Sequence, residues 1–267
     1  MNPKKELSII LPVLNEELNL KYLIPEISKI ANEVVLNNYE IIVVDDNSTD
    51  NTKTLINNFL TKNFHIVYKV RGDVKSLPLS IYEGIEVAKY QNVMWLDADG
   101  SMDGEAIKLL IENYFYEECD VLIGSRFVDG GGYKGIDNFS KNSILKIIDN
   151  LYKSEDSILA VFLSKAFNNI LQLILSINIS DLTSGFIIGK KSLFKKNMFD
   201  NFIYGEYFIF MAVSLINQNI NVKEIGYICK TRNFGDSKTS GSILRLLRLS
   251  IPYLKIAYKS RKVLHGN

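Results

Sequence analysis

The order of the apolar segments is the feature that most restricts how this 267-residue chain can fold. Short runs rich in β-branched residues alternate with stretches whose apolar residues recur every three or four positions, a spacing typical of amphipathic helices. Chains that alternate in this way form a mainly parallel sheet with helices on both faces, so the sequence predicts an α/β fold. The expected strands are residues 7–14, 40–45, 65–70, 92–97 and 121–124.

Helices can be expected from capping residues and from apolar spacing. Asp50 and Ser76 are helix-capping residue types, and we expect them to begin helices that run to Leu60 and Ala88. Residues 157–179 are strongly apolar and carry one charge, so their length alone would allow a membrane span. Polar residues at helical spacing favour an amphipathic helix instead, lying on the core or at a membrane surface. This polar stripe consists of Lys165, Asn168, Asn169, Gln172 and Ser176.

Polar residues follow three of the expected strands, at the point where each strand ends. They are residues 15–16 after the first strand, 45–46 after the second and 97–99 after the fourth. In parallel α/β sheets, ligands bind at the carboxyl ends of the strands. We therefore expect these clusters to share one binding edge.

Asp97 and Asp99 form the most informative of these clusters. Two carboxylates two residues apart, directly after a buried strand, can leave the strand together and bind one hard divalent cation. The alternative is a simple turn, because Asp and Gly favour turns and the segment reads Asp-Ala-Asp-Gly. The other motifs of the chain favour the cation site.

Those motifs are residues 9–16, 42–50, Arg71, 76–80 with Gly84, 124–127, 181–186 and 232–238. From about residue 7 to residue 238, their order and spacing resemble the family 2 glycosyltransferases of the GT-A fold. Within that family, they are similar to the branch of dolichol- and polyprenol-phosphate mannose or glucose synthases. The resemblance implies a Rossmann-like domain with a mostly parallel, mixed sheet flanked by helices.

The resemblance also implies a role for particular residues. The nucleotide-sugar donor would be bound by Pro12, Asn15, Glu16, Asp45, Asp46, Arg71, Asp97 and Ala98. Mg²⁺ or Mn²⁺ would be held by Asp97 and Asp99. The residues implied for catalysis are Asp99, Arg126, Asp181, Arg232 and Lys238. Three of these residues are basic and correspond to family positions that bind phosphate groups.

Simpler interpretations remain open for several of these positions. Asp45 and Asp46 would also suit an acidic cluster before a helix, where the helix dipole favours negative charge. Arg71 would also suit a solvated loop, and Arg126 a surface salt bridge. Asp181 is either an active-site carboxylate or a residue that orders its own loop.

The sequence departs from the branch pattern at three places. Ser101 stands where a Gln is usual, and residues 76–78 replace a Gly-Leu-Gly with a stiffer Ser-Leu-Pro. The acid common in the synthases is missing from residues 210–212, and Glu206 lies a turn earlier. The last departure weakens the case for a catalytic base in that helix.

The expected reaction is the transfer of a hexose from a UDP- or GDP-sugar to a polyprenyl phosphate, with inversion. A phosphate acceptor is already ionised at neutral pH and needs little or no general base. Two alternatives are a glycosyltransferase that extends a saccharide or glycolipid, with Asp181 or Glu206 as base, and a non-catalytic scaffold. The intact pair Asp97 and Asp99 argues against the scaffold.

The charge of the chain is unevenly distributed. From residue 236 to the end, seven basic residues face one acid, although the whole chain carries only +1. These basic residues lie among apolar ones, which predicts basic amphipathic helical segments with a break or kink at Pro252. A membrane surface is the expected partner, because no nucleic-acid-binding motif accompanies the tail. A solvated face of a packed helix is the alternative.

We therefore expect a glycosyltransferase domain at residues 1–238 and a basic tail at residues 239–267. The two cysteines lie far apart without metal-binding spacing, and the apolar run at 7–14 is too short for a signal peptide. The expected location is cytoplasmic, peripheral at the inner face of the cell membrane, with a role in cell-envelope polysaccharide synthesis.

Overall fold

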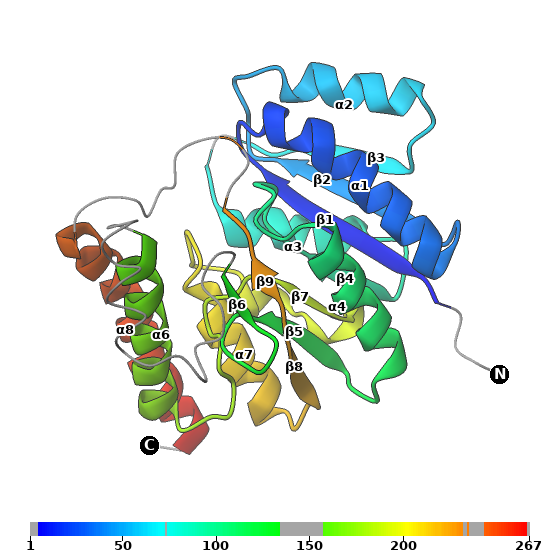
Figure 1. Ribbon diagram of the computed structural model, residues 1–267. Helices are drawn as coiled ribbons and strands as arrows, with labels where there is room; N and C mark the ends of the chain where they lie inside the picture. The colour runs from blue at the N-terminus through cyan, green and yellow to red at the C-terminus, as the bar shows by residue number, and fades with distance from the viewer. Residues whose placement is uncertain (1–4, 73, 134–156, 232–233, 235–242, 266–267) are drawn as a thin grey trace.

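A mixed sheet of seven strands forms the centre of the protein, as the computed structural model shows for residues 5–72, 74–133, 157–231, 234 and 243–265 (Figure 1). All neighbouring strands are parallel except at β7, which runs antiparallel to both β4 and β5. In spatial order the strands are β3 (Ile66–Val70), β2 (Tyr39–Asp45), β1 (Leu7–Val13), β4 (Asn92–Trp95), β7 (Ile187–Lys190), β5 (Val121–Ser125) and β8 (Val222–Gly226).

Helices cover both faces of this sheet (Figure 1). One face packs against α1 (Glu17–Val35), α2 (Thr52–Thr61) and α4 (Gly104–Tyr116). The other packs against α3 (Leu77–Val87), α6 (Ser157–Leu175) and α7 (Tyr207–Asn217). α8 (Ile243–His265) lies beside α6 and also contacts α7. Smaller elements are the strand pair β6 (Gly132–Tyr133) and β9 (Ile228–Cys229), and the 3₁₀ turns η1 (Lys191–Leu193) and η2 (Lys196–Met198).

The central strands are buried on both faces, which explains their nearly continuous apolar sequences. In β1, Leu7, Ile9 and Leu11 join one hydrophobic core, whereas Ile10 joins the other. Trp95 of β4 is almost fully buried in the second core, and its Nε1 donates a hydrogen bond of 3.0 Å to the Tyr207 hydroxyl of α7. This bond satisfies the polar atom of a large buried aromatic residue and ties α7 to the sheet.

The predicted α/β fold with a mostly parallel, mixed sheet is confirmed. Each of the five expected strands exists, and their ends differ from the prediction by at most two residues. Ser76 caps α3, whereas α2 begins one residue later than expected, with Asn51 at the N-cap position. Asp50 still accepts a hydrogen bond from the Thr52 amide, at 3.0 Å.

The polar stripe expected on residues 157–179 is only partly exposed to solvent: Asn169 and Ser176 are exposed, but Asn168 is not. Asn168 is fully buried in α6, whereas Ile170 and Leu173 of the same helix are 49% and 80% exposed. The reason is that the Asn168 side chain bonds the loop before β7: its Oδ1 accepts from the Leu182 amide, and its Nδ2 donates to the Thr183 hydroxyl. Within the described part of the chain, no helix is both long enough and apolar enough to cross a bilayer.

In its described part, residues 243–265, the basic tail forms one helix, α8, so the predicted break at Pro252 is wrong. α8 begins at Ile243 and continues through Pro252 to His265. Ala257 and Ser260 of this helix are fully buried, and Ala257 joins the second hydrophobic core. α8 is therefore packed on the α/β domain over part of its surface.

Candidate functional site

The polar clusters found in the sequence lie at one edge of the sheet because their strands are parallel. β1, β2 and β4 end at Val13, Asp45 and Trp95, so residues 14–16, 46 and 97–99 all follow carboxyl ends of neighbouring strands. The antiparallel strand β7 adds a further segment to this edge. Because β7 begins where its neighbours end, the preceding residues 181–186 lie at the same edge.

Asp45 and Asp46 are both buried at the end of β2. The Asp45 carboxylate accepts hydrogen bonds from the Ser48 amide at 2.8 Å and from the Tyr68 hydroxyl at 2.6 Å. Burial, and then the bond to Asp45, raise the pKa of Tyr68, so its hydroxyl stays protonated as a donor. Asp45 is thereby held rigidly at the end of β2.

Arg71 is a buried partner of Asp46 rather than a solvated loop residue. Its Nη1 lies 2.6 Å from one Asp46 oxygen, and the other oxygen accepts from the Ser76 amide at 2.8 Å. Only 6% of the Arg71 side chain is exposed, and its Nε also donates to Glu83. The Ser76 hydroxyl then donates to the Phe202 carbonyl, at 3.0 Å. A chain of hydrogen bonds therefore runs from the end of β2 to the loop before α7.

Asn15 and Glu16 form the turn after β1. Asn15 adopts a left-handed conformation with φ of 59°, which Asn tolerates better than most residues. Its Oδ1 accepts from the Thr49 amide at 2.7 Å, which joins this turn to the segment after β2. Glu16 accepts from the Asn19 side chain at 2.7 Å. Pro12 lies in β1 itself and is buried.

Asp97 and Asp99 lie in the turn that follows β4. Asp99 is 4% exposed, and its Oδ1 accepts from the Ser101 amide at 2.9 Å, whereas Asp97 is partly exposed. Ala98 between them is buried. In the described residues, no group of three or more His, Cys, Asp or Glu side chains gathers as a metal site. Two carboxylates with water and a diphosphate would still supply the hard oxygen ligands that Mg²⁺ and Mn²⁺ accept, so the residues fit such a cation.

Arg126 and Asp181 form a buried ion pair, which rules out a surface salt bridge. Nε and Nη2 of Arg126 each lie 2.7 Å from an Asp181 oxygen, and the Asp181 side chain is fully buried. Burial alone would lower the pKa of Arg126, but the Asp181 charge, the nearby Tyr133 and the hydrogen bonds to Asp181 together raise that pKa well above its usual value. Arg126 Nη2 also donates to the Thr183 hydroxyl at 2.9 Å, so the pair orders the loop before β7.

The last residues considered from the sequence are Arg232, Lys238 and Glu206. Arg232 and Lys238 lie outside the described residues. Phe234 between them is described: it stacks on Tyr22, and its carbonyl accepts from Asn19 at 3.3 Å, close to Glu16. Glu206 accepts a hydrogen bond from the Ile203 amide at 3.1 Å. The Glu206 carboxylate therefore stabilises the turn before α7.

Three residues of this region were not expected from the sequence. Glu83, Thr183 and Asn168 each bond a predicted site residue or its loop. Glu83 and Asn168 lie within helical spacing patterns, and no local motif marks them. Only the fold brings them to the site.

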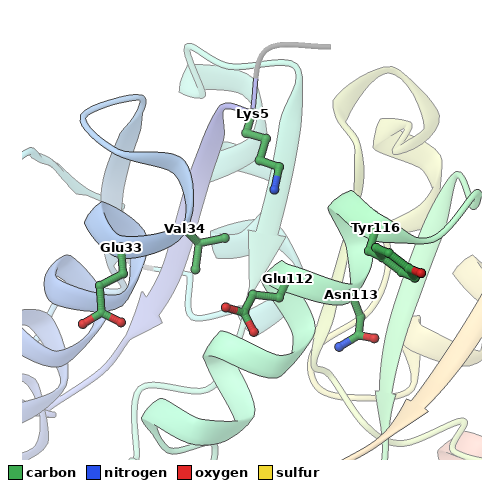
Figure 2. Close-up of a pocket in the computed structure, with 6 residues that line it drawn as sticks. All are labelled: Lys5, Glu33, Val34, Glu112, Asn113 and Tyr116. Atoms are coloured by element: carbon green, nitrogen blue, oxygen red, sulfur yellow. The ribbon is translucent and has the colours of Figure 1, made fainter. Parts of the chain in front are cut away.

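A shallow hollow of about 410 Å³ lies at the opposite edge of the sheet. Figure 2 shows that it lies between the ends of α1 and α4, with Lys5, Glu33 and Tyr116 among its lining residues. None of the residues predicted for the site lines this hollow. The carboxyl edge of the strands therefore remains the candidate site.

Comparison with known proteins identifies the family to which the sequence is similar. Residues 8–198 match the family described as Glycosyl transferase family 2. The chain is 35% identical over 126 residues to a dolichol-phosphate mannosyltransferase of Pyrococcus furiosus, a match that covers 47% of this chain but only 34% of that relative. It is 24% identical over 252 residues to a polyprenol monophosphomannose synthase of Mycolicibacterium smegmatis, covering 92% of this chain and 85% of that protein.

The fold is also shared with a solved structure. Glucosyl-3-phosphoglycerate synthase of Mycobacterium tuberculosis, crystallised with Mn²⁺, UDP and phosphoglyceric acid, superimposes with a TM-score of 0.61 at 14% identity. The superposition covers 96% of this chain and 78% of that structure. At this identity the likeness concerns the fold alone.

Proposed function

This chain belongs to glycosyl transferase family 2, and on that premise we propose that it transfers a hexose from a UDP- or GDP-sugar to a polyprenyl phosphate, with inversion. The observation that carries the proposal is the match over 92% of the chain to a polyprenol monophosphomannose synthase. The rigid, buried carboxylates at the carboxyl edge of the sheet support a nucleotide site there.

In this proposal, the donor lies across the ends of β1, β2 and β4. Pro12, Asn15 and Glu16 border the nucleotide, and Asp45 and Asp46 accept hydrogen bonds from its ribose hydroxyls or base N–H groups. Arg71 keeps Asp46 in place through their 2.6 Å ion pair. Asp97 and Asp99, with Ala98 between them, would hold Mg²⁺ or Mn²⁺. When bound, that cation supplies positive charge to the departing diphosphate.

The acceptor side is assigned to Arg126 and Asp181. Both Asp181 oxygens already accept hydrogen bonds from Arg126, so we assign Asp181 to holding the guanidinium and not to removing a proton. Arg126, together with Arg232 and Lys238, would balance phosphate charge. A phosphate monoester oxygen is ionised at neutral pH, so these residues need only align it behind the anomeric carbon.

We propose that the protein binds its lipid acceptor at a membrane surface. The exposed apolar residues Phe162, Ile170 and Leu173 lie on α6, beside a helix with many exposed basic residues. These are Arg248, Lys255, Lys259, Arg261 and Lys262 of α8, a helix without an acidic residue. Apolar side chains beside clustered cations favour a surface with anionic lipid headgroups. We propose a peripheral location at the inner face of the cell membrane, in cell-envelope polysaccharide synthesis.

The test is a transfer assay with labelled nucleotide sugars and Mn²⁺. A short isoprenyl phosphate and a panel of saccharides are offered separately as acceptors. We expect labelled product with the isoprenyl phosphate, and loss of product with Asp99→Asn. Product formed only with saccharides would replace the proposal by the saccharide-extending alternative. A protein that binds donor but transfers to no acceptor would support the scaffold.

A further inference from the structure

Tyr253 of α8 lies at the boundary between the basic helix and the candidate site. Its ring packs edge-on against Phe167 of α6, with ring centroids 6.0 Å apart. Its hydroxyl lies directly over Gly205, in the turn between Phe202 and α7. This is the turn to which the hydrogen-bonded chain from Asp46 through Ser76 leads.

Gly205 provides the space that the Tyr253 hydroxyl occupies. A Cβ atom placed on Gly205 would collide with the hydroxyl oxygen, and it would lie 3.4 Å from the ring carbon that carries this oxygen. The backbone of Gly205 is not in the left-handed region, so its conformation does not require glycine. A side chain at this position would therefore require Tyr253 to move.

The contacts of Tyr253 lead to both halves of the candidate site. Its ring contacts Phe167, which precedes Asn168, and Asn168 donates a hydrogen bond to the same Thr183 hydroxyl that accepts from Arg126. Burial raises the pKa of Tyr253, the nearby Tyr204, Glu206 and Asp97 raise it further, and Arg126 opposes them. The group is therefore a protonated hydrogen-bond donor at neutral pH. Among the described residues no hydrogen bond uses this hydroxyl, in contrast to Tyr207, whose hydroxyl accepts from Trp95.

We propose that Tyr253 is an acceptor-binding residue, whose hydroxyl donates a hydrogen bond to a phosphate oxygen of the acceptor beside Arg126. This inference rests on the proposed function, because it takes the acceptor to be a polyprenyl phosphate. It makes α8 part of the active site as well as a basic surface. The same helix then carries exposed cations and one of the groups that receive the acceptor.

The first test is the affinity for a short, water-soluble isoprenyl phosphate, measured by calorimetry in the presence of Mn²⁺ with UDP or GDP. Tyr253→Phe is expected to raise the dissociation constant about tenfold, since it removes a hydrogen bond to a charged group. Its affinity for the nucleotide and its thermal midpoint should remain unchanged. Tyr116→Phe is the matched control, because Tyr116 is 86% exposed at the opposite edge of the sheet. Equal affinities for Tyr253→Phe and the unmodified protein would overturn the inference.

The second test checks the geometry without any ligand. Gly205→Ala should lower the thermal midpoint clearly in the unmodified protein and much less in Tyr253→Phe, where the obstructing oxygen is gone. An equal loss in both backgrounds would show that the hydroxyl is not seated over Gly205, and the inference would fail.

The outcomes also separate this inference from the proposed function. Isoprenyl phosphate binding that depends on Tyr253, without transfer from any nucleotide sugar, would overturn the proposed reaction and support the binding role. If Tyr253→Phe transfers the sugar to isoprenyl phosphate as well as the unmodified protein does and binds this acceptor equally tightly, the proposed reaction is supported and the binding role of Tyr253 is overturned. An unmodified protein that does not bind isoprenyl phosphate would overturn both.

Discussion

Arg126 and Asp181 hold each other through two hydrogen bonds of 2.7 Å, one from Nε and one from Nη2. The planar guanidinium matches the carboxylate in this arrangement, which a lysine cannot reproduce. Asp181 is fully buried, and its backbone amide is in turn held by Glu224 at 2.9 Å. The pair therefore joins β5 to the loop before β7 in a part of the protein where an unpaired charge is costly.

Asp181→Asn should destabilise the protein by about 3–5 kcal/mol, because it leaves the Arg126 charge buried without its partner. Urea unfolding followed by circular dichroism measures this. The control is Glu33→Gln, which breaks an exposed pair with Lys108 and should leave the stability nearly unchanged. If Asp181→Asn keeps full stability but loses transfer activity, Asp181 acts as a base and not as the holder of Arg126.

Asp99→Asn and Asp97→Asn should remove the metal-dependent part of nucleotide binding. In the unmodified protein, UDP or GDP with Mn²⁺ at about 100 times the dissociation constant stabilises the folded state by about 2.7 kcal/mol, a shift of several degrees. Differential scanning fluorimetry with and without Mn²⁺ detects it. Asp129→Asn, at an exposed position, serves as the control. A shift that persists in both aspartate variants would contradict the metal site.

Arg71→Ala should destabilise the protein by about 3–5 kcal/mol, because it leaves the buried Asp46 carboxylate without its ion pair. It should also weaken nucleotide binding, since Asp46 would no longer be fixed at the end of β2. Lys69→Ala is a matched control: Lys69 pairs with the same Glu83 but is 33% exposed, and its loss should cost less than about 1 kcal/mol. Similar losses for the two variants would contradict the special role of Arg71.

Glu83 should make a pH-dependent contribution to stability. Its burial alone would raise the pKa, but hydrogen bonds from Lys69 and Arg71 lower it below the ordinary value of 4.5. A carboxyl whose folded-state pKa is lowered stabilises the protein above its unfolded-state pKa, and this contribution disappears as the pH falls through the folded-state value. The difference in unfolding free energy between the unmodified protein and Glu83→Gln should therefore be about 0.5–1 kcal/mol at neutral pH. Chemical denaturation should show that it vanishes in acid; a constant difference would refute the assignment.

Leu173→Glu should weaken binding to vesicles that contain anionic lipid, because this 80% exposed apolar residue lies on the exposed face of α6. Lys255→Gln and Lys259→Gln should each weaken it about fivefold, which corresponds to about 1 kcal/mol per basic residue. Co-sedimentation with vesicles measures both effects. Leu60→Glu on α2 is the control, since Leu60 is also exposed but lies on another helix. Equal losses for Leu173→Glu and Leu60→Glu would contradict a membrane-facing α6.

Much of the fold could be predicted because strand and helix periodicities are local properties of the sequence. The strands of the first half, the cap at Ser76 and the gathering of Asp45, Asp46 and Asp97 at one edge all follow from such patterns. β7 and β8 were not among the expected strands. β8 carries the charged residues Lys223 and Glu224 and is only partly buried over most of its length, so it lacks a continuous apolar run.

The partners of the site residues could not be predicted in the same way. Arg71 was predicted to bind the donor, with a solvated loop as the alternative, and neither prediction identified its partner Asp46, 25 residues earlier. Arg126 and Asp181 lie 55 residues apart, and nothing in either motif specifies that they pair. Asn168 shows the same difficulty. Helical spacing placed it on a polar stripe, but in the structure its side-chain oxygen accepts a hydrogen bond from the Leu182 backbone amide. The domain boundary at residue 238 and the roles of the site residues remain predictions.

The position of Trp95 provides a way to observe the site without a label. It is the single tryptophan of the chain, lies almost fully buried two residues before Asp97, and is hydrogen-bonded to Tyr207. Its intrinsic fluorescence therefore comes from one known place, beside the turn that carries both aspartates. Titrating nucleotide or Mn²⁺ while recording this emission would report occupancy of the turn in the unmodified protein.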